Sequence, residues 1–231
     1  MPVATLTYFR GRGRAETTRW MLAATGVQFT NVAIDTPEEL AALRASGKLP
    51  FDQMPLLEID GLNLSQSSAM VRYLARRAGL YGRNDTDAMW CDLVAGVTAD
   101  LAETAIQAAF KPSADVAVAD LQARFAKFGP RLEARIEAQG SGFCAADELT
   151  FADVVLSEAL SAYIEYCPNI LLDMPRLNRL YHEVVQMPDI ADYLKSDLRY
   201  PPAGPDYVIA AACVLQRALP PHMPDPNRFV I

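Results

Sequence analysis

The sequence has few histidines and no closely spaced cysteines. Its 231 residues include two histidines, His182 and His222, whose spacing suggests no metal site. The four cysteines lie 53, 23 and 46 residues apart, so there is no CxxC motif and no zinc-ligand cluster. We therefore expect no metal and no histidine-based triad, and we expect reduced, structural thiols at Cys91, Cys144, Cys167 and Cys213.

Net positive charge and long apolar stretches are also missing. The chain has 21 Lys and Arg against 28 Asp and Glu, a net charge of −7, which argues against sequence-independent binding to nucleic acid. The apolar runs at residues 3–9 and 207–215 are too short for a secretory signal or a bilayer span. With 51% apolar residues, the composition indicates a folded cytoplasmic protein of one or two domains, without membrane contact.

The charge is unevenly distributed along the chain. Residues 1–82 carry 9 basic and 7 acidic side chains, a balance of +2, whereas residues 83–231 carry 12 basic and 21 acidic ones, a balance of −9. The first third is therefore the part suited to receive a small anion.

Strand and helix patterns alternate through the first 80 residues. Short β-rich runs at residues 3–9 and 28–34 each precede a helical pattern, at residues 15–25 and from Pro37 onward. Two further strands, 56–59 and 62–64, flank a turn at Asp60-Gly61, and a helix covers residues 67–78. We predict an α/β domain over residues 1–80 with the order β-α-β-α-β-β-α.

Strand signals disappear after a glycine-containing linker at residues 79–87. Two long amphipathic helices are predicted around residues 90–105 and 121–136, with further helices at 151–163, 175–186, 189–194 and within 206–219. Thr150-Phe151-Ala152-Asp153 matches the capping box that begins a helix. We predict that residues 88–231 form an all-helical domain.

The end of the first strand carries the first candidate for chemistry. Tyr8 is placed at its carboxyl end, where ligands of open α/β sheets bind, and the following loop contains three arginines. The same loop half-matches a dinucleotide fingerprint at Gly11-x-Gly13, but the third glycine is missing. Taken alone, these residues favour a strand aromatic at Tyr8 and a solvated turn at the arginines, because a single tyrosine near a basic loop is common.

A second candidate surrounds Pro55. A residue before proline is extended, which leaves the backbone of Met54 free for a peptide-like ligand. Ser67 stands at a helix start, where unsatisfied N–H groups attract a carboxylate, although an ordinary N-cap has the same sequence signature. The conjunction of Tyr8, Arg14, Met54 and Ser67 favours a ligand-binding site.

With these motifs the chain resembles the cytosolic glutathione transferases of the tyrosine type, nearest the alpha and sigma classes. The resemblance covers nearly the whole chain and rests on residues 8–9, 13–16, 53–61, 66–67, 72–75 and the capping box. It implies a thioredoxin-like first domain with a cis peptide before Pro55. It also implies a homodimeric enzyme that conjugates glutathione, as co-substrate, to hydrophobic electrophiles.

The resemblance assigns catalytic roles to two residues. Tyr8 would donate a hydrogen bond to the glutathione sulfur, and Arg14 would support the thiolate electrostatically. The implied glutathione-binding residues are Tyr8, Arg14, Arg44, Lys48, Gln53, Met54, Pro55, Gln66, Ser67 and Asp100.

Each end of glutathione has its own implied partners. The backbone of Met54 would pair with the cysteinyl part, and Gln66 with Ser67 would hold the γ-glutamyl end. Asp100 would reach the γ-glutamyl amino group from the other subunit. For the glycyl carboxylate, Arg44 has the alpha-type position, and Lys48 is the alternative.

The electrophile would occupy an apolar pocket. Apolar residues can replace one another in such a pocket, so the sequence does not identify the electrophile. The expected lining is Phe9, Gly11, Ile106, Phe110 and Val208, with the tail helix around residues 208–215 as a lid. Two other functions fit the same family: a glutathione-dependent isomerase, as in sigma-type prostaglandin synthases, and a non-catalytic ligand carrier. Ile106 and Phe110 fit an ordinary helix core equally well.

Overall fold

The first third of the chain, which forms the N-terminal half of the fold, has the elements that the sequence predicts. A computed structural model describes residues 3–223, and its first elements alternate strand and helix in the order β-α-β-α-β-β-α, with one short 3₁₀ turn added. These elements are β1 (Ala4–Tyr8), η1 (Gly13–Ala15), α1 (Glu16–Ala24), β2 (Phe29–Ala33), α2 (Pro37–Ala45), β3 (Leu56–Ile59), β4 (Leu62–Ser65) and α3 (Ser67–Ala78).

The four strands form one mixed sheet in the order β2-β1-β3-β4. Strand β1 pairs in parallel with β2 and antiparallel with β3, and β3 turns back into β4 at Asp60-Gly61. Both turn residues have positive φ, 54° and 76°, as a tight hairpin requires. Leu6, Leu57 and Trp20 are fully buried, so β1 lies in the interior and its carboxyl end is held rigidly.

The second half is helical within the described residues. Its helices are α4 (Asp85–Ala108), α5 (Ala114–Gln139), α6 (Phe151–Tyr166), α7 (Pro175–Val185), α8 (Pro188–Lys195) and α9 (Pro205–Val214). Helix α4 begins inside the predicted linker because the Asn84 side chain accepts hydrogen bonds from the N–H groups of Thr86 and Asp87, both at 3.0 Å. No helix among residues 3–223 has both the length and the apolarity that a bilayer span needs.

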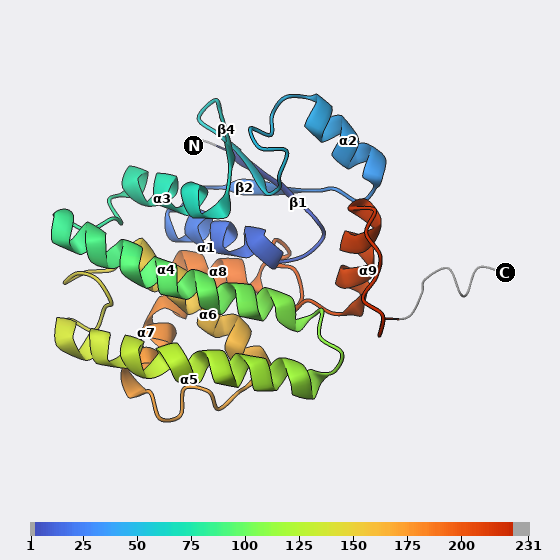
Figure 1. Cartoon of the computed structure of the whole chain (residues 1–231). Coiled ribbons are helices and arrows are strands. Elements are labelled where there is room, and N and C mark those ends of the chain that lie inside the picture. Colours follow the sequence, from blue (N-terminus) through green and yellow to red (C-terminus); the bar gives the residue numbers. More distant parts are fainter. Residues whose placement is uncertain (1–2, 224–231) are drawn as a thin grey trace.

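The two halves pack closely against each other. Helices α1 and α3 lie between the sheet and the C-terminal helices, and α1 contacts α6 and α8 (Figure 1). Helix α9 stands apart from the bundle and contacts α2 of the first half. The end of β1 therefore lies where both halves and α9 meet.

The predicted capping box begins α6. Asp153 is fully buried, and its carboxylate accepts the backbone N–H and the hydroxyl of Thr150, both at 2.8 Å, and the N–H of Cys144 at 2.7 Å. Burial raises the pKa of Asp153, and these three hydrogen bonds act against that rise. Asp153 therefore fastens the loop before α6 as well as the helix start.

The four cysteines are free thiols. Cys91, Cys144 and Cys167 are buried, and burial raises the pKa of the Cys91 thiol to about 11 and that of Cys144 well above its usual value. A buried protonated thiol is a poor nucleophile, which fits the structural role expected for these three. Cys213, on α9, is exposed.

Candidate functional site

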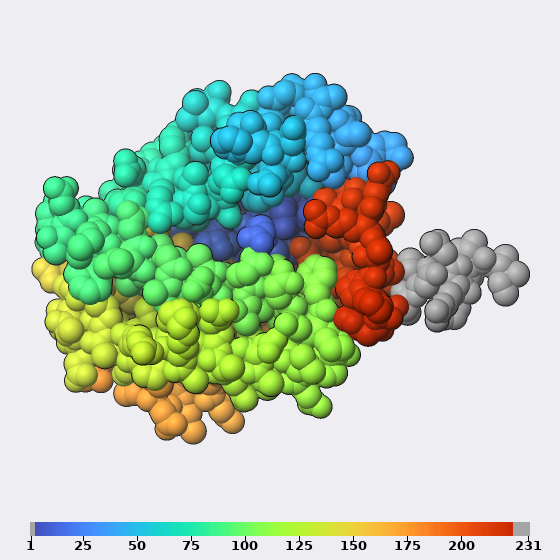
Figure 2. Space-filling view, viewed as in Figure 1, coloured from blue at the N-terminus to red at the C-terminus, as the bar shows by residue number. Residues whose placement is uncertain are grey.

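A cavity of about 590 Å³ opens at the carboxyl end of β1. Figure 2 shows the hollow between the two halves, with the first residues of the chain at its floor and α9 closing one end. The cavity unites all the predicted glutathione-binding residues except Lys48 and Asp100, and it includes the predicted pocket residue Phe9. Its lining is Tyr8, Phe9, Arg14, Leu40, Arg44, Asp52, Gln53, Met54, Pro55, Gln66, Ser67, Leu215 and Arg217.

Tyr8 is the last residue of β1 and is 6% exposed. Its hydroxyl accepts a hydrogen bond from the backbone N–H of Arg14 at 3.3 Å, so the loop after β1 folds back over the ring. Gly13 makes this return possible, because it has φ +41° and a Cβ there would lie 2.9 Å from the Tyr8 hydroxyl oxygen. The phenol is thus held in a defined position in the lining of the cavity.

Arg14 brings positive charge to the same cavity. Its Nη2 lies 2.6 Å from Oε2 of Glu103, a residue of α4, and both side chains are about half exposed. The ion pair ties the loop after β1 to α4. It also neutralises part of the charge that Arg14 offers to an anion.

The Met54–Pro55 peptide is cis, as the resemblance implied. Gln53 and Gln66 line the cavity on the same side, and the Gln66 amide donates a hydrogen bond to the Gln53 oxygen at 2.8 Å. Gln66 has φ +67°, an unusual conformation outside glycine, and α3 begins directly after it at Ser67. The start of α3, with its favourable dipole for an anion, therefore borders the cavity.

The structure separates Arg44 from Lys48. Arg44 lines the cavity, with its Nε 3.4 Å from the Asp52 carbonyl oxygen. The Lys48 ammonium instead pairs with Glu58 at 2.7 Å and is not among the lining residues. Of the two candidates for the glycyl carboxylate, Arg44 has the better position.

Asp100 lies away from this cavity, on α4. It faces a different hollow, lined also by Lys111 and Arg124, and its carboxylate is 3.9 Å from the Arg124 guanidinium. Its side chain is 57% exposed. A role for Asp100 in binding glutathione therefore requires a second subunit.

A smaller cavity of about 60 Å³ adjoins the loop after β1 on the helical side. Ile106 lines it, as predicted for the electrophile pocket, together with Gly13 and Tyr207. Its lining also includes charged residues, among them Arg12, Glu158, Glu165 and Arg199.

Three predicted pocket residues are placed differently. Gly11 is covered by the ring of Tyr207, since a Cβ on Gly11 would lie 2.3 Å from the ring. Phe110 follows the end of α4 and Val208 is fully buried; neither is among the residues that line the two cavities at this loop. The ring of Tyr207 thus occupies space that the sequence analysis assigned to the electrophile.

Tyr207 and Arg217 are functional candidates that the sequence analysis did not identify. A Cβ on Gly13 would lie 2.5 Å from the Tyr207 hydroxyl and 2.9 Å from that of Tyr8, so the two phenols reach the same point. Burial, followed by the charge and hydrogen bond of Tyr8, raises the pKa of Tyr207. Nothing local in the sequence predicts this contact, because the two tyrosines are far apart in the chain.

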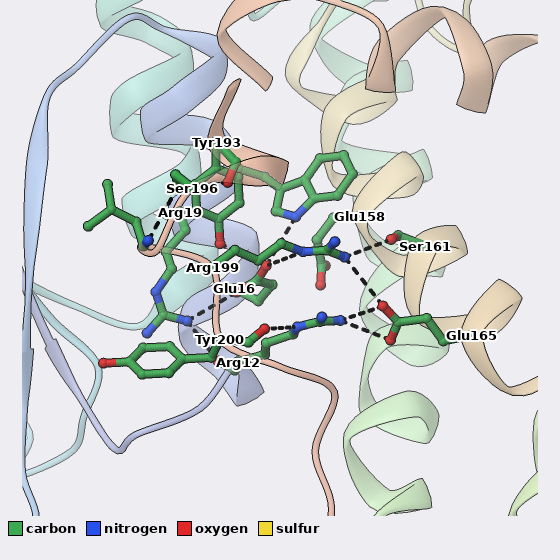
Figure 3. A network of polar contacts seen from close by, with 12 residues as sticks. Arg12, Glu16, Arg19, Glu158, Ser161, Glu165, Tyr193, Ser196, Arg199 and Tyr200 are labelled. Carbon is green, nitrogen blue, oxygen red and sulfur yellow. Dashed lines mark hydrogen bonds and ion pairs between the residues drawn. The ribbon is translucent and has the colours of Figure 1, made fainter. Parts of the chain in front are cut away.

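A polar network beneath the site joins the two halves (Figure 3). Arg12 donates to both carboxylate oxygens of Glu165, at 2.7 and 2.8 Å, and to the carbonyl oxygen of Tyr200 at 2.6 Å. Arg199 approaches the same Glu165 at 3.4 Å. The network therefore connects the loop after β1 with α6 and with the segment that leads to α9.

Arg19 holds the same loop from the opposite side. It is 1% exposed, donates to the Gly11 carbonyl oxygen at 3.0 Å and pairs with buried Glu16 at 3.1 Å. Glu16 also accepts hydrogen bonds from Tyr193 at 2.8 Å and from Trp20 at 3.3 Å. Because these buried charges have several partners, the loop that carries Gly13 and Arg14 has a well-defined position.

Glu158 is a buried carboxyl in this network, 9% exposed, with a hydrogen bond from Thr17 at 2.9 Å. Burial and then nearby Glu16 raise its pKa to about 8, against the opposing effects of Thr17, Arg12 and Arg199. Because the folded state binds this proton more tightly than the unfolded state does, protonated Glu158 contributes to the free energy of unfolding. The contribution is full below the pKa that the carboxyl has in the unfolded chain, and it is lost as the pH rises to about 8.

We expect Glu158→Gln to flatten the pH dependence of stability. The free energy of unfolding, measured by urea denaturation, should fall less between about pH 5 and about pH 8 in this variant than in the wild type. Glu183→Gln, at an exposed position, is the matched control and should keep the wild-type slope. Equal slopes in wild type and Glu158→Gln would contradict the raised pKa of Glu158.

Comparisons with known proteins agree with this geometry. The family model of the glutathione S-transferase N-terminal domain matches residues 4–76, and that of the C-terminal domain matches residues 99–197. Glutathione S-transferase A4 of Mus musculus is 36% identical over 216 residues, covering 91% of this chain and 97% of that protein. Glutathione S-transferase alpha M14 of Sus scrofa is 34% identical, covering 85% and 90%.

Solved structures give the same result. A nematode-specific glutathione transferase of C. elegans is 29% identical with a TM-score of 0.73, covering 87% of this chain and all of that one. Prostaglandin synthase D of Nilaparvata lugens, 24% identical with a TM-score of 0.71 and covering 85% and 98%, shares the fold. Both predicted parts of the fold, the thioredoxin-like domain and the helical domain, are confirmed. The chain belongs to the glutathione S-transferase family.

Proposed function

We propose that the cavity at the end of β1 binds glutathione, and that Tyr8 and Arg14 stabilise its thiolate for attack on hydrophobic electrophiles. The observation that carries this proposal is the convergence of Tyr8, Arg14, Met54 and Ser67, from separate stretches of chain, on one cavity. The product is a thioether: the thiol releases its proton to solvent, the thiolate sulfur bonds to an electrophilic carbon, and the bond from that carbon to its leaving group, chloride in a chlorinated nitrobenzene, breaks. We propose the cytosolic detoxification of such electrophiles as its purpose. In the proposed division of the chain, residues 1–80 bind glutathione and residues 88–231 contribute the electrophile pocket.

The residue types suit this chemistry. A free thiol has a pKa near ~8.5 and is mostly protonated at neutral pH, and each unit of depression requires about 1.4 kcal/mol in favour of the thiolate. A phenol is protonated at neutral pH and can donate a hydrogen bond to sulfur, and a guanidinium adds favourable Coulomb energy. Tyr8 and Arg14 supply both groups in the lining of one cavity, and the backbone N–H of Arg14 donates a hydrogen bond to the Tyr8 hydroxyl.

Two assays test the proposal. The protein should be retained on immobilised glutathione and should conjugate glutathione to a chlorinated nitrobenzene, followed by the absorbance of the product. Retention without turnover on a broad panel of electrophiles would contradict the transferase and favour a ligand carrier. Turnover of a prostaglandin endoperoxide alone would favour the isomerase.

No chemistry in the proposal needs a metal. Glutathione itself is the co-substrate, and its sulfur provides the nucleophile. Among residues 3–223, no three side chains of His, Cys, Asp and Glu are grouped so as to hold a metal ion. Activity of the purified enzyme should therefore be unaffected by a chelator, measured with the same chlorinated substrate.

We further propose that the chain acts as a homodimer, because Asp100 does not line the cavity of its own chain and large apolar side chains are exposed in the loop before β3 and on α4. Phe51 is 66% exposed, and Met89 and Leu93 on α4 are 46% and 51% exposed. Burying such side chains against a second copy would remove apolar surface from water.

We expect Phe51→Asp to weaken the dimer. Light scattering should give twice the chain mass for the wild type and a lower, concentration-dependent mass for the variant, because a buried unpaired charge is costly. Leu172→Asp, at a position 79% exposed on the opposite part of the chain, is the matched control and should stay dimeric. A wild type of single-chain mass at assay concentration would contradict the dimer.

A further inference from the structure

The end of α9 turns sharply toward the glutathione cavity. Gln216 follows the helix with φ +50°, and the N–H of Arg217 bonds to the Ala212 carbonyl oxygen at 2.9 Å, the pattern of a helix-terminating turn. Leu215 and Arg217, on either side of Gln216, both line the cavity. The turn therefore brings a cation from the C-terminal segment to the site of the first domain.

The charges around the cavity are incompletely balanced. It contains three cations, Arg14, Arg44 and Arg217, and one anion, Asp52. Arg14 is paired with Glu103, and the Arg44 Nε donates to a neutral carbonyl oxygen. Within the described part of the chain, Arg217 has no ion pair with an acidic side chain. Its guanidinium is a charge without a structural partner, next to a cavity proposed for an anion.

The position of Arg217 identifies which end of the ligand it meets. Glutathione has one carboxylate at the γ-glutamyl end and one at the glycyl end, with the thiol between them. The γ-glutamyl end is proposed for Ser67, at the start of α3. Helix α9 instead contacts α2, the helix that carries Arg44. Arg217 therefore lies on the Arg44 side, the glycyl side, of the cavity.

We infer that Arg217 is a glutathione-binding residue, whose guanidinium pairs with the glycyl carboxylate alongside Arg44. This inference rests on the proposed function, because it names a further residue for the same ligand. It has a consequence for α9: the co-substrate fastens the end of this helix to the first domain. At the other end, Tyr207 already covers Gly11 and approaches Tyr8. Bound glutathione would thus hold α9 closed over the sulfur.

The direct test is the dissociation constant of glutathione, measured by calorimetry. Arg217→Gln should weaken binding about fivefold at low salt, and less at high salt, because the lost contact is an exposed charge pair. Arg217→Lys should recover part of the affinity. Arg179→Gln removes the same charge from an exposed site on α7 and should bind as the wild type does.

The glycyl ethyl ester of glutathione tests which carboxylate is involved. It lacks the charge that Arg217 would meet, so Arg217→Gln and wild type should bind the ester equally. Hydrogen exchange supplies a second measurement: glutathione should slow exchange in residues 205–214 of the wild type more than in Arg217→Gln.

Several results would overturn the inference. They are an unchanged glutathione affinity in Arg217→Gln, an equal loss in Arg179→Gln, and a loss for the ester as large as that for glutathione. If the wild type itself fails to bind glutathione, the proposed function fails instead. The two failures are therefore distinguishable.

Discussion

Replacing Tyr8 with phenylalanine is expected to lower kcat for conjugation by about 10²-fold, with little change in the KM for glutathione. Removing one preorganised donor to a developing or stabilised anion has effects of this size. In the proposed complex the hydroxyl contacts the sulfur, whereas the two carboxylate ends of glutathione bind at Ser67 and Arg44, so ground-state affinity should be retained. Steady-state kinetics with the chlorinated nitrobenzene measure both constants.

The absorbance of the bound thiolate gives an independent measurement of the same variant. Its apparent pKa should rise in Tyr8→Phe, since the thiolate loses a hydrogen bond. Tyr181→Phe is the matched control, because Tyr181 lies on α7 and lines neither cavity at the loop after β1. Unchanged kcat and an unchanged thiolate pKa in Tyr8→Phe would remove Tyr8 from the mechanism.

The hydroxyl of Tyr207 is expected to limit the loss of kcat in Tyr8→Phe. The Tyr207 hydroxyl lies close enough to the Tyr8 hydroxyl for both to crowd a Cβ on Gly13. In Tyr8→Phe it is the nearest remaining phenolic donor. The double variant Tyr8→Phe/Tyr207→Phe should therefore have a lower kcat than Tyr8→Phe, and the two substitutions should not be additive.

The sequence predicted the secondary structure well because the relevant signals are local. Alternation of apolar residues, the turn at Asp60-Gly61 and the capping box each act within a few residues, and all three are found in the structure. Helix α4 begins at Asp85, inside the predicted linker, because Asn84 caps its N-terminus; the nearby glycines had indicated a longer linker. The order of the strands in the sheet depends on tertiary packing and was not predicted.

The electrophile side was harder to predict, for geometric reasons. Val208 follows Tyr207 on one helix, where successive residues point about 100° apart, so when Tyr207 faces the cavity Val208 faces the interior. Phe110 was expected in the electrophile pocket with the same family resemblance in view, but α4 ends at Ala108, before this residue. A helical period predicts which residues share a face and not where the helix stops.

The contacts that the C-terminal segment makes with the first domain were not predicted from the sequence. Arg12 meets Glu165, and Arg217 reaches the cavity of the first domain, across separations that no local pattern encodes. Except for Lys48 and Asp100, the residues that the resemblance assigns to glutathione line one cavity, because the resemblance carries tertiary information from a known fold. It said nothing of Tyr207 or Arg217.

Replacing Asp153 with alanine is expected to lower the free energy of unfolding by about 3–5 kcal/mol. The carboxylate accepts three hydrogen bonds, from the Thr150 N–H, the Thr150 hydroxyl and the Cys144 N–H, and all of them are buried. Removing the acceptor leaves three donors unsatisfied and opens a void beside α6. Urea denaturation followed by circular dichroism measures the change.

Two variants separate this effect from simple loss of charge. Asp153→Asn keeps one acceptor oxygen but turns an N–H₂ group toward the remaining donors, so its stability should lie between wild type and Asp153→Ala. Asp115→Ala removes an exposed acid from the first turn of α5 and should cost about 0.5 kcal/mol, through the helix dipole alone. If Asp153→Ala and Asp115→Ala lost equal stability, the buried hydrogen bonds of Asp153 would not be what secures α6 and the loop before it.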